Sequence, residues 1–288
     1  MKLFIKSGIT SLVLASLMIA PMASAATSPG LGAANTFNIL SGSYVNTTPG
    51  TTLAGDLGYT TGPAVAPTVG GSTHVANSTY NQAGIDQGNA LSFLNNQPCT
   101  FNFAPGPIDL ATDTTHGPVA VYTPGVYCIT GAASVTVSAT VTLNGAGVYI
   151  FRMDGALTTG ANSIVSLING ASACDVWWTP TQATSLGANS TFAGTDIDAA
   201  GITVGNNVTW NGQALAFGGT ATTDSDTFTS PTCAASRSAT PAGPTTAPVL
   251  PNTGNGSSST FSNLVIITVS VLAMTLAGAL AYKKQRSL

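Results

Sequence analysis

The chain has 288 residues, of which 44% are hydrophobic and only 6% are charged. From Ala26 to Cys233 it has no lysine and no glutamate, one arginine and all ten aspartates, which gives this part a formal net charge of −9. Without a basic patch it cannot hold a phosphate backbone, so nucleic acid is excluded as a partner. Val, Ile, Leu, Phe and Trp recur in alternating runs, which argues against disorder and predicts one folded domain at 26–233.

The first 25 residues, MKLFIKSGITSLVLASLMIAPMASA, have the pattern of a secretory signal peptide. Lys2 and Lys6 precede an apolar run, and a small-residue Ala-Ser-Ala ends at Ala25. We therefore expect residues 1–25 to be removed and the mature protein to be exported.

One segment, Asn77–Asn95, has apolar residues at helical spacing behind an Asn77 or Ser78 cap. Gly84 and Gly88 should weaken this helix by about 1 kcal/mol each. The apolar stripe consists of Tyr80, Ala83, Ala90, Leu91 and Leu94.

Four cysteines lie in the exported part, and an even number outside the cell favours two disulfides. They are Cys99, Cys128, Cys174 and Cys233, which allow three pairings, of which we favour one that joins Cys99 to Cys128. A metal site is disfavoured because no Cys-x-x-Cys occurs and His74 and His116 lie in separate stretches. The sequence predicts neither a metal nor a cofactor.

A short phrase repeats in the second half of the chain. SLGANSTFAG at Ser185–Gly194 returns as TVGNNVTWNG at Thr203–Gly212, and Ser185, Thr203 and Thr222 are 18 and 19 residues apart. Upstream, VTVSATVTL and LTTGANSIVSL belong to the same series. A period near 18 with β-branched residues and Gly or Asn turns predicts a three-sided β-solenoid with about six residues per side.

Stacked coils turn these repeats into columns, because side chains alternate between the interior and the surface along each strand. The predicted interior residues are Val137, Thr159, Leu186, Val204 and Thr223, then Val165, Phe192 and Trp210 on the next side, and Thr159 and Thr223 fit an apolar interior poorly. The first outward column is Thr136, Thr158, Ser185, Thr203 and Thr222. The second is Thr142, Thr191 and Thr209, interrupted by Ile164. A turn file of Thr140, Asn162, Asn189, Asn207 and Asp226 lies between them.

Residues 234–249 are rich in Pro, Thr and Ala and predict an extended stalk. They precede LPNTG at 250–254, an apolar run at 264–282 long enough to span a bilayer, and a basic tail at 283–288. This order resembles the sorting signal of Gram-positive surface proteins, in which a sortase would cut between Thr253 and Gly254 and link the chain to peptidoglycan. The alternative is a plain membrane anchor; both interpretations place the domain at the cell surface.

Several stretches, among them LGAANTFNILSGSYVN, TPGVY, GVYIFRMDGALTT and LINGASACDVWW, resemble the microbial ice-binding proteins. The resemblance covers nearly all of Pro29–Cys233. It implies a mainly β fold, a right-handed, three-sided β-solenoid with one long α-helix packed alongside, whose first strands pair out of sequence order. It also implies an ice crystal surface as the partner, although only Thr159-Gly160-Ala161-Asn162 matches the Thr-Ala/Gly-x-Thr/Asn pattern of some members.

The outward columns suit this function because hydroxyl and methyl groups would recur about every 4.8 Å on an uncharged face. Threonine is also simply a good strand residue, which would explain the columns by folding alone. An enzyme is not expected, because the only close carboxylate pairs, Asp196 with Asp198 and Asp224 with Asp226, are typical of solvated turn residues. The main alternative is a surface adhesin that binds a glycan or host ligand through Trp177, Trp178 or Trp210.

Overall fold

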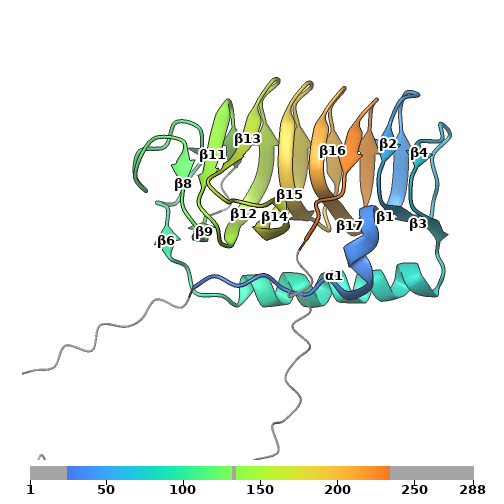
Figure 1. The fold of residues 1–288 in the computed structure, drawn as a ribbon, viewed down its shortest axis with the longest axis horizontal. Helices are drawn as coiled ribbons and strands as arrows, with labels where there is room; N and C mark the ends of the chain where they lie inside the picture. The colour runs from blue at the N-terminus through green and yellow to red at the C-terminus, as the bar shows by residue number, and fades with distance from the viewer. Residues whose placement is uncertain (1–24, 132–133, 234–288) are drawn as a thin grey trace, which may run out of the picture. The chain divides into compact units, whose positions relative to one another are not determined.

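The computed structural model describes residues 25–131 and 134–233, which form one unit of parallel β-strands with one long helix (Figure 1). Successive turns of the chain stack as coils, and the helix runs along one side of the stack. The prediction of a mainly β fold with one helix is therefore confirmed. The predicted stalk and sorting signal, at 234–249 and 250–288, and residues 1–24 of the predicted signal peptide lie outside the described ranges. In residues 25–131 and 134–233, no helix is long and apolar enough to cross a membrane.

All strand pairings are parallel and follow three ladders, with long strands passing from one ladder to the next. The first ladder faces the helix and consists of β6 (Phe101–Asn102), β9 (Gly125–Ile129), the starts of β12 (Tyr149–Thr159) and β14 (Val176–Leu186), the end of β15 (Thr191–Ile197), the middle of β17 (Thr209–Thr223), β1 (Phe37–Asn46), β3 (Asp56–Tyr59) and β5 (Thr73–Val75).

The other two ladders carry the predicted outward columns. One consists of β7 (Ile108–Asp109), β10 (Val135–Val137), the ends of β12 and β14, β16 (Ile202–Val204), and the ends of β17 and β1. The other consists of β8 (Val121–Tyr122), β11 (Thr140–Asn144), β13 (Ile164–Ile168), the starts of β15 and β17, β18 (Thr227–Thr229), β2 (Thr52–Leu53) and β4 (Thr68–Val69).

The N-terminal strands stack beyond the C-terminal ones, which confirms the pairing out of sequence order. β1 lies beside β17, and β2 lies beside β18, so the coil of residues 37–53 follows the coil of residues 213–229. The chain then returns through the helix to the opposite end of the stack, where β6 pairs with β9.

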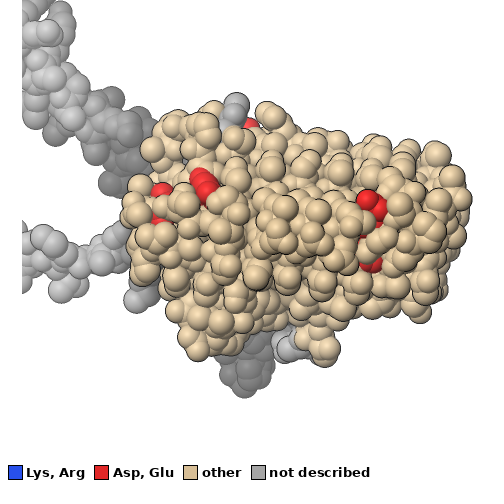
Figure 2. Space-filling model, turned by 90° about the horizontal axis from the view of Figure 1, so that it is seen from above, with Lys and Arg blue, Asp and Glu red and all other residues tan. Residues whose placement is uncertain are grey.

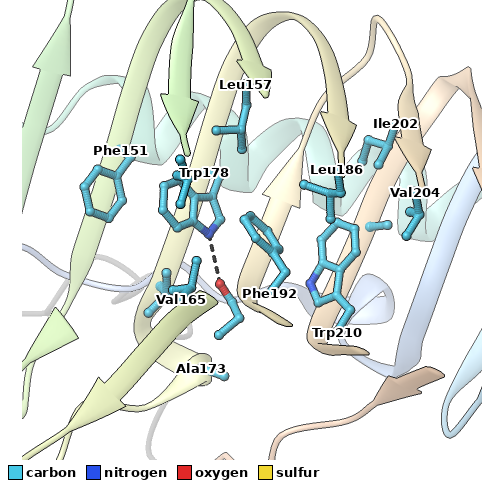
Figure 3. Close-up of a cluster of buried hydrophobic side chains, with 14 of the residues drawn as sticks. Phe151, Leu157, Val165, Ala173, Trp178, Leu186, Phe192, Ile202, Val204 and Trp210 are labelled. Atoms are coloured by element: carbon cyan, nitrogen blue, oxygen red, sulfur yellow. Dashed lines mark hydrogen bonds between the residues drawn. The ribbon is translucent and has the colours of Figure 1, made fainter. Parts of the chain in front are cut away.

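Inward side chains of the stacked coils form a continuous apolar interior (Figure 3). Aromatic rings run along it from coil to coil, with centroid distances of 4.4 Å for Phe151–Trp178, 5.2 Å for Trp178–Phe192 and 4.9 Å for Phe192–Trp210. The predicted core position of Trp210 is confirmed, since it is fully buried and its indole N–H donates to the Gly194 carbonyl.

The predicted inward residues are all buried, including the two threonines that suited an apolar interior poorly. Thr223 Oγ1 bonds the Tyr44 hydroxyl at 2.8 Å and the Asn46 amide oxygen at 2.9 Å. Thr159 Oγ1 accepts from the Gly187 N–H at 2.9 Å. Each hydroxyl therefore replaces the water it loses with protein partners.

The helix α1 spans Ser78–Asn95, and the Asn77 side chain caps it by accepting from the Tyr80 N–H at 2.9 Å. It packs against outward apolar residues of the helix-facing ladder and against the 3-10 helix η1 (Gly32–Thr36). Of the predicted stripe, Leu91 is only partly buried; Tyr80, Ala83, Ala90 and Leu94 are buried. Gly84 is also buried, and Phe217 packs so closely on it that a Cβ at this position would lie 2.3 Å from the ring.

Two disulfides connect distant segments, and the predicted Cys99–Cys128 pair is confirmed. It ties the segment after α1 to β9. The second, Cys174–Cys233, ties the 3-10 helix η2 (Ala173–Asp175) to the end of the described domain. The Cys174–Cys233 disulfide thus ties the last described residue, Cys233, to the domain. The predicted stalk begins at the next residue.

Candidate functional site

The first predicted column is a real ladder, which we call the Thr203 ladder. Adjacent coils pair its members directly, and they alternate with buried residues on either side in sequence. The ladder runs in the order Asp109, Thr136, Thr158, Ser185, Thr203, Thr222 and Val45. Thr158, Ser185 and Thr203 are exposed, whereas Thr136 and Thr222 are half-buried. An aspartate thus begins this ladder and an exposed valine ends it.

The second predicted column has a different membership, and we call the observed one the Thr209 ladder. Thr142 was placed wrongly in it, because Thr142 pairs with Ser166, and Thr140 is the residue opposite Ile164. The error arose because residues two apart on one strand share a face, so spacing alone leaves the register open. The ladder runs in the order Thr140, Ile164, Thr191, Thr209, Thr227, Thr52 and Thr68, and every member is exposed.

Thr227, Thr52 and Thr68 are residues that sequence reasoning missed. Thr227 follows Thr209 by 18 residues, so the repeat contained its signal. Nothing in the period indicates Thr52 or Thr68, because they join the ladder only through the stacking of β2 beside β18. Five threonines therefore follow one another without interruption from Thr191 to Thr68.

The turn between the two ladders contains residues in the left-handed region. Asn162, Asn189, Asn207 and Ser225 have φ between 56° and 60°, which asparagine tolerates better than most residues. The predicted turn file was therefore right at its three asparagines and wrong at Thr140, which begins β11, and at Asp226, whose place Ser225 takes. The Asn207 amide donates to the Asn189 side-chain oxygen at 3.0 Å. The left-handed backbone at these positions and the Asn207–Asn189 bond explain the Asn file by folding alone.

Glycines beside the Thr203 ladder keep adjacent coils close together. A Cβ on Gly187 would lie 2.4 Å from the Gly160 backbone, and one on Gly205 would lie 2.6 Å from the Leu186 carbonyl oxygen. No larger residue fits between the coils here, so the strip next to the ladder is bare backbone.

Charge is scarce on the described surface (Figure 2). The single arginine of this part, Arg152, donates to the Gln97 carbonyl on the helix side. Asp109, at the end of the Thr203 ladder, accepts from the Ser138 hydroxyl and backbone N–H. Asp224 accepts from the Thr48 hydroxyl in the turn region. No charged residue belongs to the Thr209 ladder.

The prediction that the paired aspartates are solvated was wrong for three of the four. Asp196, Asp198 and Asp226 are buried, with exposed fractions of 0%, 1% and 0%. Burial raises the pKa of Asp226 to about 6, although its carboxylate accepts from the N–H groups of Val208 and Asp224. Neither pair therefore presents two exposed carboxylates.

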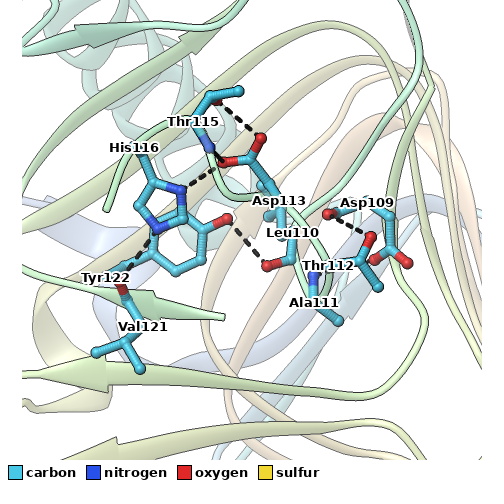
Figure 4. Close-up of polar contacts among 9 residues, drawn as sticks. All are labelled: Asp109, Leu110, Ala111, Thr112, Asp113, Thr115, His116, Val121 and Tyr122. Atoms are coloured by element: carbon cyan, nitrogen blue, oxygen red, sulfur yellow. Dashed lines mark hydrogen bonds and ion pairs between the residues drawn. The ribbon is translucent and has the colours of Figure 1, made fainter. Parts of the chain in front are cut away.

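A second polar cluster lies at the β6–β8 end of the stack (Figure 4). His116 stacks on Tyr122 with ring centroids 3.9 Å apart, and its Nδ1 lies 2.5 Å from the Asp113 carboxylate. Burial raises the pKa of Asp113, but hydrogen bonds from His116 and Thr115 outweigh it and hold the pKa below its usual value. These contacts fold the loop over the end coil and leave no titratable group free for a ligand.

In the described ranges, the side chains named for a sugar site or a cysteine metal site are buried or bonded. Trp177 and Trp178 are buried like Trp210, so no tryptophan offers a stacking surface for a sugar. The four cysteines are used in disulfides, and no group of three or more His, Cys, Asp or Glu residues could hold a metal ion in residues 25–131 and 134–233.

Comparisons with known proteins point to the same family throughout. The model of the ice-binding-like family matches residues 39–229. An ice-binding protein of Nostoc sp. strain HG1 is 29% identical over 220 residues, covering 71% of this chain and 75% of that protein. Ice-binding protein 1 of Shewanella frigidimarina is 37% identical over 161 residues, 53% of this chain and 16% of that protein. The ice-binding protein of the Antarctic ascomycete Antarctomyces psychrotrophicus aligns with a TM-score of 0.61 at 30% identity, over 70% of this chain and 97% of that chain.

Proposed function

Because the chain belongs to the ice-binding-like family, we propose that it adsorbs to ice as a right-handed, three-sided β-solenoid and without catalysing a reaction. The observation that carries the proposal is the pair of exposed hydroxyl ladders on the two sides of the coil stack that the helix leaves open. Coils about 4.8 Å apart repeat a hydroxyl and a methyl group in a rigid row, which can hold surface waters in an ordered array. Charged groups would keep their own hydration and disturb that order.

We place the main ice contact on the Thr209 ladder. It has five consecutive exposed threonines and no charged member, whereas the Thr203 ladder begins at Asp109 and includes two half-buried residues. Beside the Thr209 ladder on the same strands, Thr142 pairs with Ser166 and Asn211 pairs with Thr229, but the buried Ala193 opposite Asn211 interrupts this second row. The Thr203 ladder stays a predicted surface, and matched variants on the two ladders decide between them.

We further propose that the domain is displayed outside the cell. The signal peptide at 1–25 supports export, and LPNTG with the apolar run at 264–282 supports anchoring by a sortase or in the membrane. The disulfides Cys99–Cys128 and Cys174–Cys233 suit an oxidising, extracellular compartment. Such a protein would present the ice-contacting surface at the end of a stalk.

The deciding experiment is uptake of the labelled protein into a slowly grown ice hemisphere. An ice-binding protein is incorporated, whereas a protein that does not bind is excluded by the advancing front. Incorporation well above that of an unrelated protein of the same size is the expected result. Exclusion would refute the proposal and favour the adhesin interpretation.

A further inference from the structure

Three polar side chains lie together inside the coils, behind the Thr203 ladder. Asp196, Asp198 and Thr184 have exposed fractions of 0%, 1% and 0%. Asp196 points inward, because its partners in the adjacent coils, Trp178 and Ala214, both belong to the apolar interior. A carboxyl group therefore occupies a position where the neighbouring coils place apolar side chains.

The hydrogen bonds of this cluster are incomplete when both carboxyls are ionised. Thr184 Oγ1, both Asp196 oxygens and Asp198 Oδ2 have no hydrogen-bond partner among the described residues. Asp198 is better accommodated, since its Oδ1 accepts from the Ala200 N–H at 2.8 Å. An ionised carboxylate offers acceptors only, so two of them around one hydroxyl cannot satisfy all these atoms. A buried polar atom without a hydrogen bond costs folding free energy, so such atoms are rare in native proteins and each one has to be explained.

We propose that the Asp196 carboxyl is protonated in the folded protein and that its O–H donates a hydrogen bond to Thr184 Oγ1. The Thr184 hydroxyl in turn donates a hydrogen bond to Asp198 Oδ2. One bound proton then gives a partner to Thr184 Oγ1, to one Asp196 oxygen and to Asp198 Oδ2 together. The Thr184 hydroxyl lies near enough to both carboxyls to lower the pKa of each. The cluster is thus a proton-binding site in the interior of the domain.

The electrostatics favour the proton on Asp196. Burial, followed by the charge of Asp198, raises the pKa of Asp196 well above 3.8. Burial also raises the pKa of Asp198, but hydrogen bonds from backbone N–H groups, Ala200 first, favour its ionised form. The other side chains that pair with or face Asp196 from β14 and β17 are Trp178, Thr184 and Ala214, none of which titrates. Asp198 is therefore the one charged group that acts on it in the described domain.

The sign of the pH effect follows from the raised folded pKa. The unfolded chain releases this proton near pH 3.8, whereas the folded chain keeps it. The stabilisation is complete below that pH and is lost as the pH rises through the folded pKa of Asp196. Between the two pKa values each pH unit lowers the folding equilibrium constant about tenfold. The domain, including the adjacent coils that carry Ser185 and Thr203, thus becomes less stable as the pH rises above 3.8.

Infrared spectroscopy tests the bound proton directly in the full chain. A protonated buried carboxyl gives a carbonyl stretching band separate from the carboxylate bands, and at pH 8 exposed aspartates are ionised. We expect this band in the unsubstituted chain at pH 8. Its absence there would overturn the proposal without reference to any variant.

Variants then assign the band. Asp196→Asn, which keeps shape and removes the proton, should abolish it and reduce the fall in stability between pH 5 and pH 8, to which Asp226, with its pKa raised to about 6 by burial, still contributes. The matched Asp198→Asn should keep the band, because burial, the larger cause of the raised pKa of Asp196, is unchanged. Thr184→Val should keep the band but shift its frequency because the acceptor is gone. If Asp196→Asn does not fold, the Thr184→Val shift carries the assignment. A band lost in Asp198→Asn, or unshifted in Thr184→Val, would place the proton elsewhere and refute the inference.

Discussion

Substitution of Thr209 by tyrosine is the sharpest test of the ice-contacting surface. Thr209 is exposed and lies between Thr191 and Thr227 as the second member of the five-threonine run. A tyrosine ring would rise above these neighbours, which are one coil or about 4.8 Å away on either side. A flat, rigid crystal surface held off by the ring could then no longer reach any of the five threonines of the run.

The magnitude follows from how many threonines the ice surface can no longer reach. If each of the five threonines contributes about 0.5 to 1 kcal/mol, their joint removal from the ice costs about 2.5 to 5 kcal/mol, or a fall in affinity of about 60-fold to several thousand-fold. Thr209→Val keeps the shape and removes one hydroxyl, so it should cost about 1 kcal/mol, or about fivefold. Because the side chain is exposed, the free energy of unfolding should change by less than about 0.5 kcal/mol in either variant.

Thermal hysteresis and ice uptake measure the effect, with chemical denaturation as the check on folding. Thr203→Tyr is the matched control on the other ladder, and Ala199→Tyr is an exposed control outside both. We expect Thr209→Tyr to lose nearly all activity while both controls keep most of it. Full activity in Thr209→Tyr together with its loss in Thr203→Tyr would show that the ice-contacting surface is the Thr203 ladder.

Other variants test the ladder and the packing around it. Ile164→Thr should raise the affinity for ice by about one hydrogen bond, roughly fivefold, because it extends the hydroxyl row to Thr140, and thermal hysteresis should increase with it. Unchanged hysteresis would argue that the row ends at Thr191. Gly88→Ala should stabilise the domain by about 0.5 to 1 kcal/mol in thermal melts, since nothing lies within 4 Å of its Cβ position. Gly84→Ala should instead destabilise it by about 1 to 3 kcal/mol through the clash with Phe217, and equal effects of the two would refute this packing. Asp113→Asn should reduce the loss of stability in acid, because the lowered pKa of Asp113 stabilises the folded chain above pH 3.8 and this stabilisation is lost as the pH falls through the folded pKa. If urea titrations show the same fall in stability below pH 3.8 in the variant, the contact is contradicted.

The sequence by itself determined whatever depends on residues near one another along the chain. The helix predicted at Asn77–Asn95, the inward residues and the register of Thr136, Thr158, Ser185, Thr203 and Thr222 follow from local spacing, whereas the cap was left open between Asn77 and Ser78 until the structure showed Asn77. Periods of two, 3.6 and about 18 residues are each repeated often enough to reveal one face of a strand, a helix or a coil. The cysteine count indicated two disulfides, whereas Cys99–Cys128 was one choice among three pairings that the structure then confirmed.

Only the tertiary structure decided what depends on contacts between distant segments. Thr52 and Thr68 join the Thr209 ladder because the N-terminal coil stacks on the C-terminal one, a contact that no repeat interval encodes. The structure also moved Thr142 out of that ladder, since positions two residues apart face the same way and only hydrogen-bond pairing selects one of them. Asp196 likewise looked like a solvated turn residue, because its burial depends on the coils packed on either side of it. Local patterns report which way a side chain points, whereas the stacking of whole coils determines what it meets there.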